Sequence, residues 1–116
     1  SAHRAAYPDT PAYALGYSNG ANILASVLFR EPALVDRAAL LHPLIPFRPL
    51  DQPGLAGRQV LITAGRRDPI CPLPMTQTLE TWFRAQGASV DLALHDGGHE
   101  IRQDEVARLA AFLRAP

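Results

Sequence analysis

Short runs of apolar residues alternate with longer segments that are apolar on one side only. The apolar runs cover residues 13–15, 38–41, 60–64 and 90–94, and each predicts a β-strand. Residues 21–29, 72–86 and 101–113 have apolar positions at helical spacing and predict helices. Strands that alternate with helices along a chain form a parallel sheet covered on both faces. We therefore predict an α/β fold with about four strands and three helices.

The predicted helices also indicate which side chains reach the core. In the second helix, Leu79, Trp82 and Phe83 share one face. In the last helix the predicted buried face consists of Val106, Leu109, Ala110 and Leu113. Residues 43–57 are rich in proline and glycine, which predicts a loop and not a further element.

Composition and charge narrow the class of protein. The 116 residues suffice for one domain, 1–116, and 11 basic residues balance 11 acidic ones. A net charge of zero favours neither nucleic acid nor an anionic membrane surface as partner. The apolar runs are too short to cross a bilayer. Cys71 is the single cysteine and no secretory signal is visible, so we expect a reducing, cytoplasmic setting.

A nucleophile motif follows the first predicted strand. Residues 16–20 read Gly-Tyr-Ser-Asn-Gly and match G-x-S-x-G, with a strand before the motif and a helix after it. Such a turn needs glycine where a Cβ would clash, and it exposes the Oγ of Ser18 above the sheet. It also directs the backbone N–H of Asn19 toward a developing oxyanion. The alternative is a serine that caps the helix in a glycine-rich turn.

An acid and a base follow later strands. Asp68 comes directly after the strand over 60–64, at the edge where parallel sheets bind ligands. His99 lies in a glycine loop after the strand over 90–94. The chain order Ser18, Asp68, His99 is that of the α/β-hydrolase triad. The alternatives are a surface histidine, and an aspartate that caps the next helix or pairs with a neighbouring arginine.

Other polar residues support weaker hypotheses. Residues 95–100 contain two histidines and two acids, but two glycines break the helical spacing that a metal motif needs, so we predict no metal and no cofactor. Cys71 is expected to be a buried loop thiol and not a nucleophile. His42, after the second strand, either lines the pocket or bonds to backbone at the strand end.

The stretch from Tyr13 to Leu113 resembles the phospholipase/carboxylesterase family of α/β-hydrolases. The motif at 16–20, the segment Gly65-Arg-Arg-Asp-Pro-Ile-Cys-Pro72 and Gly97-Gly-His99 are similar to the nucleophile, acid and histidine loops of that family. The resemblance implies Ser18 as nucleophile, Asp68 as acid, His99 as base and the Asn19 amide as one oxyanion donor.

The resemblance covers only the C-terminal half of the family's fold. The other oxyanion donor of the family comes from a loop in the first half. The chain also begins Ser-Ala-His-Arg without an initiator Met, which is typical of a processed product, a fragment or a domain of a longer polypeptide. We therefore expect the strand over 13–15 to pair with a missing N-terminal half or with another copy of the chain.

The function that these features predict is hydrolysis of a small carboxylic ester or thioester through an acyl-enzyme on Ser18. The loop over 43–57 is too short for a substantial cap and predicts an open site. Two alternatives stay open: a prolyl-oligopeptidase-type peptidase, and a non-catalytic binding module of the same fold.

Overall fold

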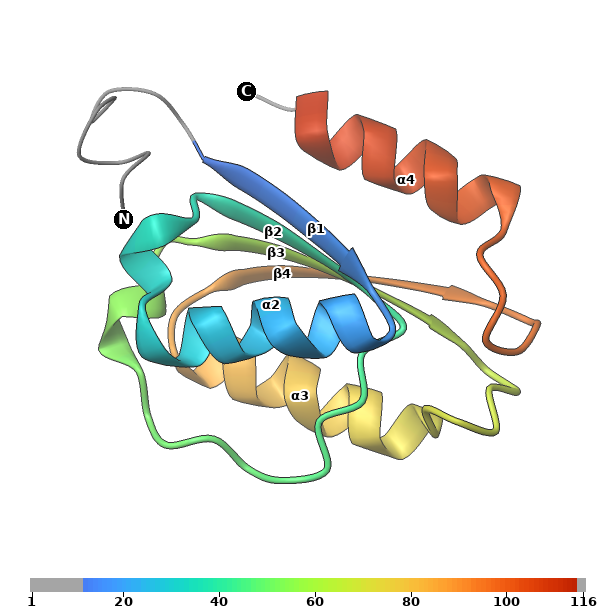
Figure 1. Ribbon diagram of the computed structural model, residues 1–116, viewed down its shortest axis with the longest axis horizontal. Helices are drawn as coiled ribbons and strands as arrows, with labels where there is room; N and C mark the ends of the chain where they lie inside the picture. Colours follow the sequence, from blue (N-terminus) through green and yellow to red (C-terminus); the bar gives the residue numbers. More distant parts are fainter. Residues whose placement is uncertain (1–11, 115–116) are drawn as a thin grey trace.

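The sheet of this protein is parallel throughout. A computed structural model describes residues 12–114 (Figure 1). Its strands are β1 (Tyr13–Tyr17), β2 (Arg37–Leu41), β3 (Gln59–Gly65) and β4 (Ser89–His95). They lie in the sheet in chain order, and each pairs in parallel with the next. The predicted fold class is confirmed, since parallel strands of this kind alternate with helices along the chain.

Three helices among residues 12–114 cover the two faces of the sheet. They are α2 (Asn19–Arg30), α3 (Leu73–Ala85) and α4 (Gln103–Arg114). Figure 1 shows α2 and α3 on one face and α4 on the other. The larger core lies under α2 and α3, where Trp82 and Phe83 are almost fully buried, as their spacing predicted. Burial of large aromatic side chains is a main source of stability in such a layer.

The buried face of α4 differs from the prediction. Val106 is 50% exposed, whereas the neighbouring Glu105 is only 3% exposed. Leu109 and Phe112 pack against the small apolar cluster of this sheet face. Leu109, Ala110 and Leu113 are half-buried, as predicted. The prediction fails in the first turn of α4, where Glu105 takes the inward position in place of Val106 because it reaches buried hydrogen-bond partners that sequence spacing does not reveal.

The loops contain two short elements that the sequence did not predict. Single turns of 3-10 helix occur at Pro32–Leu34, after α2, and at Pro53–Leu55, inside the proline-rich segment. Each begins with proline, whose fixed φ suits the first position of a helical turn. The rest of the segment over 43–57 is irregular, as predicted.

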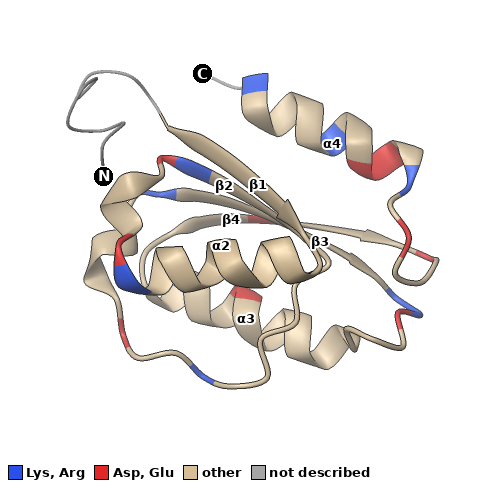
Figure 2. Ribbon diagram, viewed as in Figure 1, with Lys and Arg blue, Asp and Glu red and all other residues tan. Residues whose placement is uncertain are grey.

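One edge of the sheet carries exposed apolar side chains. Within the described residues β1 is an edge strand, and its Tyr13, Leu15 and Tyr17 are 46%, 55% and 39% exposed. Basic and acidic residues are intermixed over the ribbon (Figure 2). Across residues 12–114 no helix combines the length and apolar character needed to cross a membrane.

Candidate active site

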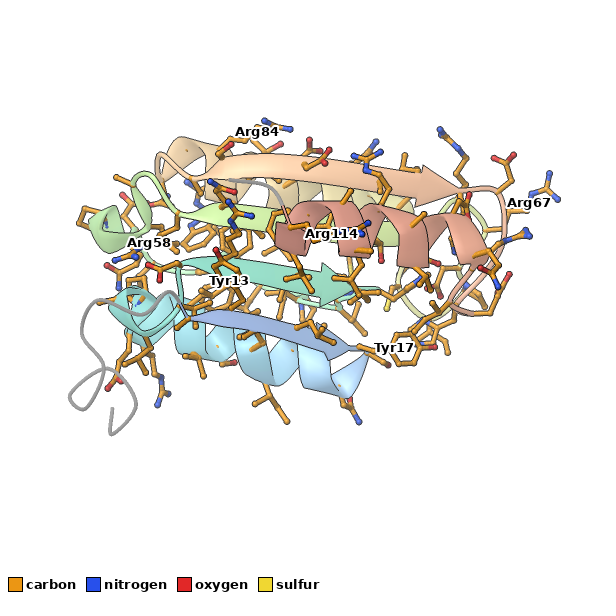
Figure 3. All side chains as sticks on the ribbon, turned by 90° about the horizontal axis from the view of Figure 1, so that it is seen from above. Tyr13, Tyr17, Arg58, Arg67, Arg84 and Arg114 are labelled. Atoms are coloured by element: carbon orange, nitrogen blue, oxygen red, sulfur yellow. The ribbon has the colours of Figure 1, made fainter. Side chains whose placement is uncertain are left out.

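The three residues predicted to carry chemistry meet at the carboxyl edge of the sheet. Ser18 follows β1, Asp68 lies three residues beyond β3, and His99 lies four residues beyond β4. In Figure 3 the labelled Tyr17 and Arg67, chain neighbours of Ser18 and Asp68, lie at this end of the sheet. Because parallel strands end together, residues far apart in the sequence come within hydrogen-bonding reach here.

Ser18 occupies a sharp turn between β1 and α2. Its φ of 54° and ψ of −114° are unusual for a residue with a Cβ, and its N–H donates to the Leu41 carbonyl at 2.9 Å. A Cβ at Gly16 would collide with the backbone of Gly20, so glycine is required at that position. At Gly20 itself an added Cβ would meet no atom of the described residues within 4 Å, so the predicted clash does not occur there.

The side chain of Ser18 does not cap the helix. It makes no cap hydrogen bond, so the alternative of a helix-capping serine is wrong. Its Oγ instead lies 2.9 Å from Nε2 of His99. Nδ1 of His99 lies 2.7 Å from Oδ2 of Asp68. Serine, histidine and aspartate thus form one continuous hydrogen-bonded chain.

Asp68 is a buried carboxylate with many donors. Burial alone would raise its pKa. The hydrogen bonds that it accepts outweigh burial and lower the pKa to about 2; in order of effect they come from the Cys71 amide, His99, the Ile70 amide and His42. The carboxylate of Asp68 is therefore ionised at neutral pH and accepts a hydrogen bond from an N–H group of His99. Asp68 does not cap the following helix, because α3 begins at Leu73. It does not pair with Arg66 either, because Arg66 pairs with Asp96.

Backbone contacts hold the acid loop and the histidine loop together. The N–H groups of Arg66 and Arg67 donate to the carbonyls of His95 and Gly97 at 2.8 and 3.0 Å. A Cβ at Gly65 would overlap the carbonyls of the histidine loop, so this close approach needs glycine. The ring of His99 is bonded to Ser18 and Asp68 and its side chain is only 18% exposed, so the alternative of a surface histidine is wrong.

Tyr17 anchors the histidine loop from a third direction. Its hydroxyl donates to the carbonyl of His99 at 2.7 Å, and the two rings lie 5.4 Å apart. Burial, and then the negative charge of Asp68, raise the pKa of Tyr17, so its hydroxyl keeps the proton that it donates. No sequence pattern predicts this role, because it depends on a contact between residues 82 positions apart.

Asn19 is the first residue of α2 and lies exposed beside Ser18. A backbone N–H in the first turn of a helix has no acceptor within the helix. The positive end of the helix dipole adds to its attraction for an anion. The Asn19 amide can therefore donate to an oxygen that gains negative charge next to Ser18.

His42 is the residue at this edge that sequence reasoning assigned wrongly. It neither lines an open pocket nor bonds its ring to backbone, because it is fully buried and faces two carboxylates. Nδ1 lies 3.2 Å from Oδ2 of Asp68, and Nε2 lies 2.8 Å from Oε2 of Glu105. On the far side of Glu105, Oε1 lies 2.7 Å from Nε2 of His95.

Within the part of the chain that the structure describes, two groups of side chains have the donor atoms that a metal ion could use. They are His42, Asp68 and His99, and His42, His95 and Glu105, each with ligand atoms within 4.8 Å of one another. In both groups nitrogen already faces oxygen at hydrogen-bond distance. Protons between these atoms account for the arrangement. Of the residues over 95–100, Asp96 instead pairs with Arg66.

Cys71 is a buried thiol, as predicted. Burial and the charge of Asp68 raise its pKa to about 11, so it is protonated at neutral pH. Its Sγ lies 3.3 Å from the carbonyl of His42 and donates to it. A protonated, buried thiol is a poor nucleophile.

Comparison with known proteins identifies relatives of one kind. The sequence model of the dienelactone hydrolase family matches residues 6–107. The putative hydrolase MhqD of Bacillus subtilis is 44% identical over 92 residues, which are 79% of this chain and 46% of that protein. The region that the family model matches includes Ser18, Asp68 and His99.

Several solved structures are also similar to this chain. A protein of unknown function from Agrobacterium tumefaciens is 53% identical with a TM-score of 0.90, over 97% of this chain and 55% of that one. A carboxylesterase of Bacillus cereus is 34% identical with a TM-score of 0.83, over 93% of this chain and 52% of that one. The predicted likeness to carboxylesterases of the α/β-hydrolase fold is confirmed. The chain spans about half the length of these relatives.

Proposed function

The chain belongs to the dienelactone hydrolase family, and we propose that it carries the nucleophile, base and acid of a serine hydrolase that cleaves a carboxylic ester or thioester. One observation supports this most: Ser18, His99 and Asp68 form a hydrogen-bonded chain with distances of 2.9 and 2.7 Å. Such a chain turns a serine hydroxyl into a nucleophile.

The first half of the reaction acylates Ser18. As Oγ bonds to the substrate carbonyl carbon, its proton passes to Nε2 of His99. Asp68 stabilises the imidazolium that forms, and the Asn19 N–H donates to the oxyanion of the tetrahedral intermediate. The intermediate then collapses, and Nε2 returns the proton to the departing alcohol or thiol. An acyl group remains on Oγ.

The second half releases the acid. A water molecule gives a proton to Nε2 of His99 while its oxygen attacks the acyl carbon. The new tetrahedral intermediate breaks its bond to Oγ of Ser18, and Nε2 returns the proton to that oxygen. The products are the free carboxylic acid and the original enzyme.

Exposed apolar residues close in sequence to the site residues favour an acyl substrate. Ile70 and Ile101, which lie two residues from Asp68 and His99, are 54% and 45% exposed. Tyr17, beside Ser18, is 39% exposed. Exposed apolar groups around a polar centre are typical of ligand sites. A small acyl group could contact them while its carbonyl faces Ser18.

The proposal includes a partner for β1. Its apolar edge is unpaired within the described residues, and the chain covers about half of its relatives. We propose that a first-half segment of the α/β-hydrolase fold pairs with this edge. That segment would also supply the second oxyanion donor.

A fluorophosphonate probe tests the hydrolase mechanism on the full-length protein. The probe should label Ser18 and no other serine, because only an activated hydroxyl attacks it. Ser26, on α2, is a matched control, since its hydroxyl bonds only to the Asn22 carbonyl. An unlabelled, folded protein would favour a non-catalytic module. Cleavage of peptide substrates in preference to esters would favour a peptidase.

A further inference from the structure

A chain of buried hydrogen bonds continues from Asp68 into the interior. His42 contacts Asp68 on one side and Glu105 on the other. Glu105 in turn contacts His95, which is the last residue of the chain of contacts. His42, Glu105 and His95 are 0%, 3% and 5% exposed. Burying polar and ionisable groups is costly unless they are paired, and an apolar residue at position 42 would avoid that cost. Packing alone therefore does not explain why these polar side chains are buried here.

The backbone of His42 is held in an unusual conformation. Its φ is 54°, in the left-handed region that favours glycine, and its N–H donates to the Thr63 carbonyl at 3.0 Å. A residue with a Cβ stays in that region only where its surroundings enforce it, and such residues cluster at functional sites. The preceding residue, Leu41, accepts the N–H of Ser18. The strained backbone thus lies directly against the turn that carries the nucleophile.

Both carboxylate oxygens of Asp68 are occupied by hydrogen-bond partners. Oδ1 accepts the N–H groups of Ile70 and Cys71 at 2.8 and 2.9 Å. Oδ2 accepts Nδ1 of His99 at 2.7 Å and faces Nδ1 of His42 at 3.2 Å. A carboxylate has about four lone-pair sites, so all of them are in use. Without His42, Oδ2 would keep one buried lone pair without a donor, and the carboxylate could rotate away from His99.

The contact between His42 and Asp68 determines which nitrogen of the His42 ring carries a proton. An ionised carboxylate only accepts hydrogen bonds, so the bond to Asp68 requires a proton on Nδ1 of His42. The bond between Nε2 and Glu105 contains a second proton, which these two groups share.

Glu105 is itself held in place. Its Oε1 accepts the N–H of Arg102 at 3.0 Å and faces Nε2 of His95. Because Nδ1 of His95 accepts the N–H of Gly97 at 2.9 Å, the proton of that ring is on Nε2. Glu105 is thus fixed from two sides and in turn fixes the ring of His42.

We propose that His42 is a positioning residue of the hydrolase, which holds Oδ2 of Asp68 toward His99, and that Glu105 orients its ring. The inference rests on the proposed function, because it assigns His42 to the acid of that reaction. His42 does not touch the substrate. Its effect should appear in kcat, through Asp68 and His99, and not in KM.

Two polar variants of the full-length protein separate the contact of His42 with Asp68 from its contact with Glu105. The amide nitrogen of asparagine lies near the position of Nδ1, so His42→Asn keeps the donor to Asp68. The amide nitrogen of glutamine lies near Nε2, so His42→Gln keeps the bond to Glu105 and loses the donor to Asp68. We expect His42→Gln to lower kcat for p-nitrophenyl acetate about 10- to 100-fold, the scale of one hydrogen bond to a charged group, with KM changed less than about twofold. His42→Asn should stay within about threefold of the unmodified protein.

The same two variants are then combined with Asp68→Asn. If His42 acts through Asp68, the difference between His42→Gln and His42→Asn should disappear in that background. An equal difference in both backgrounds, or equal kcat values for the two variants with Asp68 intact, would overturn the proposal. Asparagine tolerates a positive φ better than glutamine, so urea unfolding of each variant is measured alongside.

A measurement without substitution covers variants that fail to fold. The ¹⁵N shifts of the imidazole nitrogens in the full-length protein should show a protonated Nδ1 in His42 and an unprotonated Nδ1 in His95. An unprotonated Nδ1 in His42 would refute the contact. Ser18→Ala is assayed in parallel: if it retains full activity, the proposed function fails, while the imidazole spectrum still decides whether His42 donates to Asp68.

Discussion

Ser18 and His42 lie side by side at the ends of paired strands, and both have a φ of 54°. β1 and β2 are paired up to Tyr17 and Leu41, so these two residues are the next ones along each strand. They are the non-glycine residues with positive φ among residues 12–114. Each of two neighbouring strands thus ends at a residue with a positive φ. One turn presents the candidate nucleophile, and the other buries a histidine against its acid.

Asp68→Asn should preserve the fold and greatly reduce turnover. The asparagine amide cannot stabilise the His99 imidazolium and can favour the wrong tautomer of the ring. By analogy with the same change in a serine protease, kcat should fall by up to about 10⁴. Steady-state kinetics on an activated ester, with circular dichroism of the same sample, measures both effects. A folded variant with unchanged kcat would remove Asp68 from the reaction.

The low pKa of Asp68 also predicts how stability depends on pH. Its pKa is 3.8 when unperturbed and about 2 in the folded protein. The ionised form is therefore favoured by folding, and its stabilisation is complete above pH 3.8 and lost as the pH falls through about 2. The difference corresponds to about 2 kcal/mol of unfolding free energy.

Urea unfolding of the unmodified protein and of Asp68→Asn measures this contribution. The stability gap between them should shrink by about 2 kcal/mol between about pH 6 and about pH 2, because titration of groups distant from Asp68 cancels in the comparison. A gap that is independent of pH would mean that the carboxylate is not held ionised by its hydrogen bonds.

How far the sequence predicts this molecule depends on the range of the interactions. The strands, the helices and the loops of Ser18, Asp68 and His99 follow from local patterns, since each is marked by apolar runs and glycines close by in sequence. The burial of Trp82 and Phe83 likewise follows from helical spacing.

The buried network behind Asp68 could not be predicted in this way. Its residues come from the end of β2, the first turn of α4 and the end of β4, so only the packed fold brings them together. Glu105 is polar and lies at the start of a helix, a position where exposure is the usual expectation. The same contact explains why Glu105, and not the predicted Val106, faces inward in the first turn of α4.

Cys71 should be unreactive and dispensable for turnover. Its pKa is raised from 9.0 to about 11, which lowers its thiolate fraction about 100-fold below that of an ordinary cysteine near pH 8. Iodoacetamide should therefore modify the folded protein at least about 100-fold more slowly than a free thiol. Cys71→Ala should retain more than half of the activity. Rapid inactivation by iodoacetamide, prevented by that substitution, would point to a thiol nucleophile.

The exposed edge at β1 should control association when residues 1–116 are expressed alone. An unpaired apolar edge is a template for strand pairing, so we expect this polypeptide to self-associate and to lack ordinary esterase turnover. Leu15→Lys adds a charge on the exposed side of β1 and should reduce association, whereas Ile23→Lys, at an exposed position of α2, should not. Light scattering gives the mass of each. A stable monomer with ordinary turnover would contradict the proposed partner of β1.

Hydrolysis of a p-nitrophenyl ester by Ser18→Ala tests the central claim most directly. The measurement compares this variant of the full-length protein with Ser26→Ala, which removes an exposed hydroxyl of the same helix segment. If Ser18 is the nucleophile, its variant should lose about 10³-fold or more in kcat, down to the residual that binding and the oxyanion donors supply. Ser26→Ala should keep the full rate. Unchanged ester hydrolysis by Ser18→Ala in a folded protein would contradict the account.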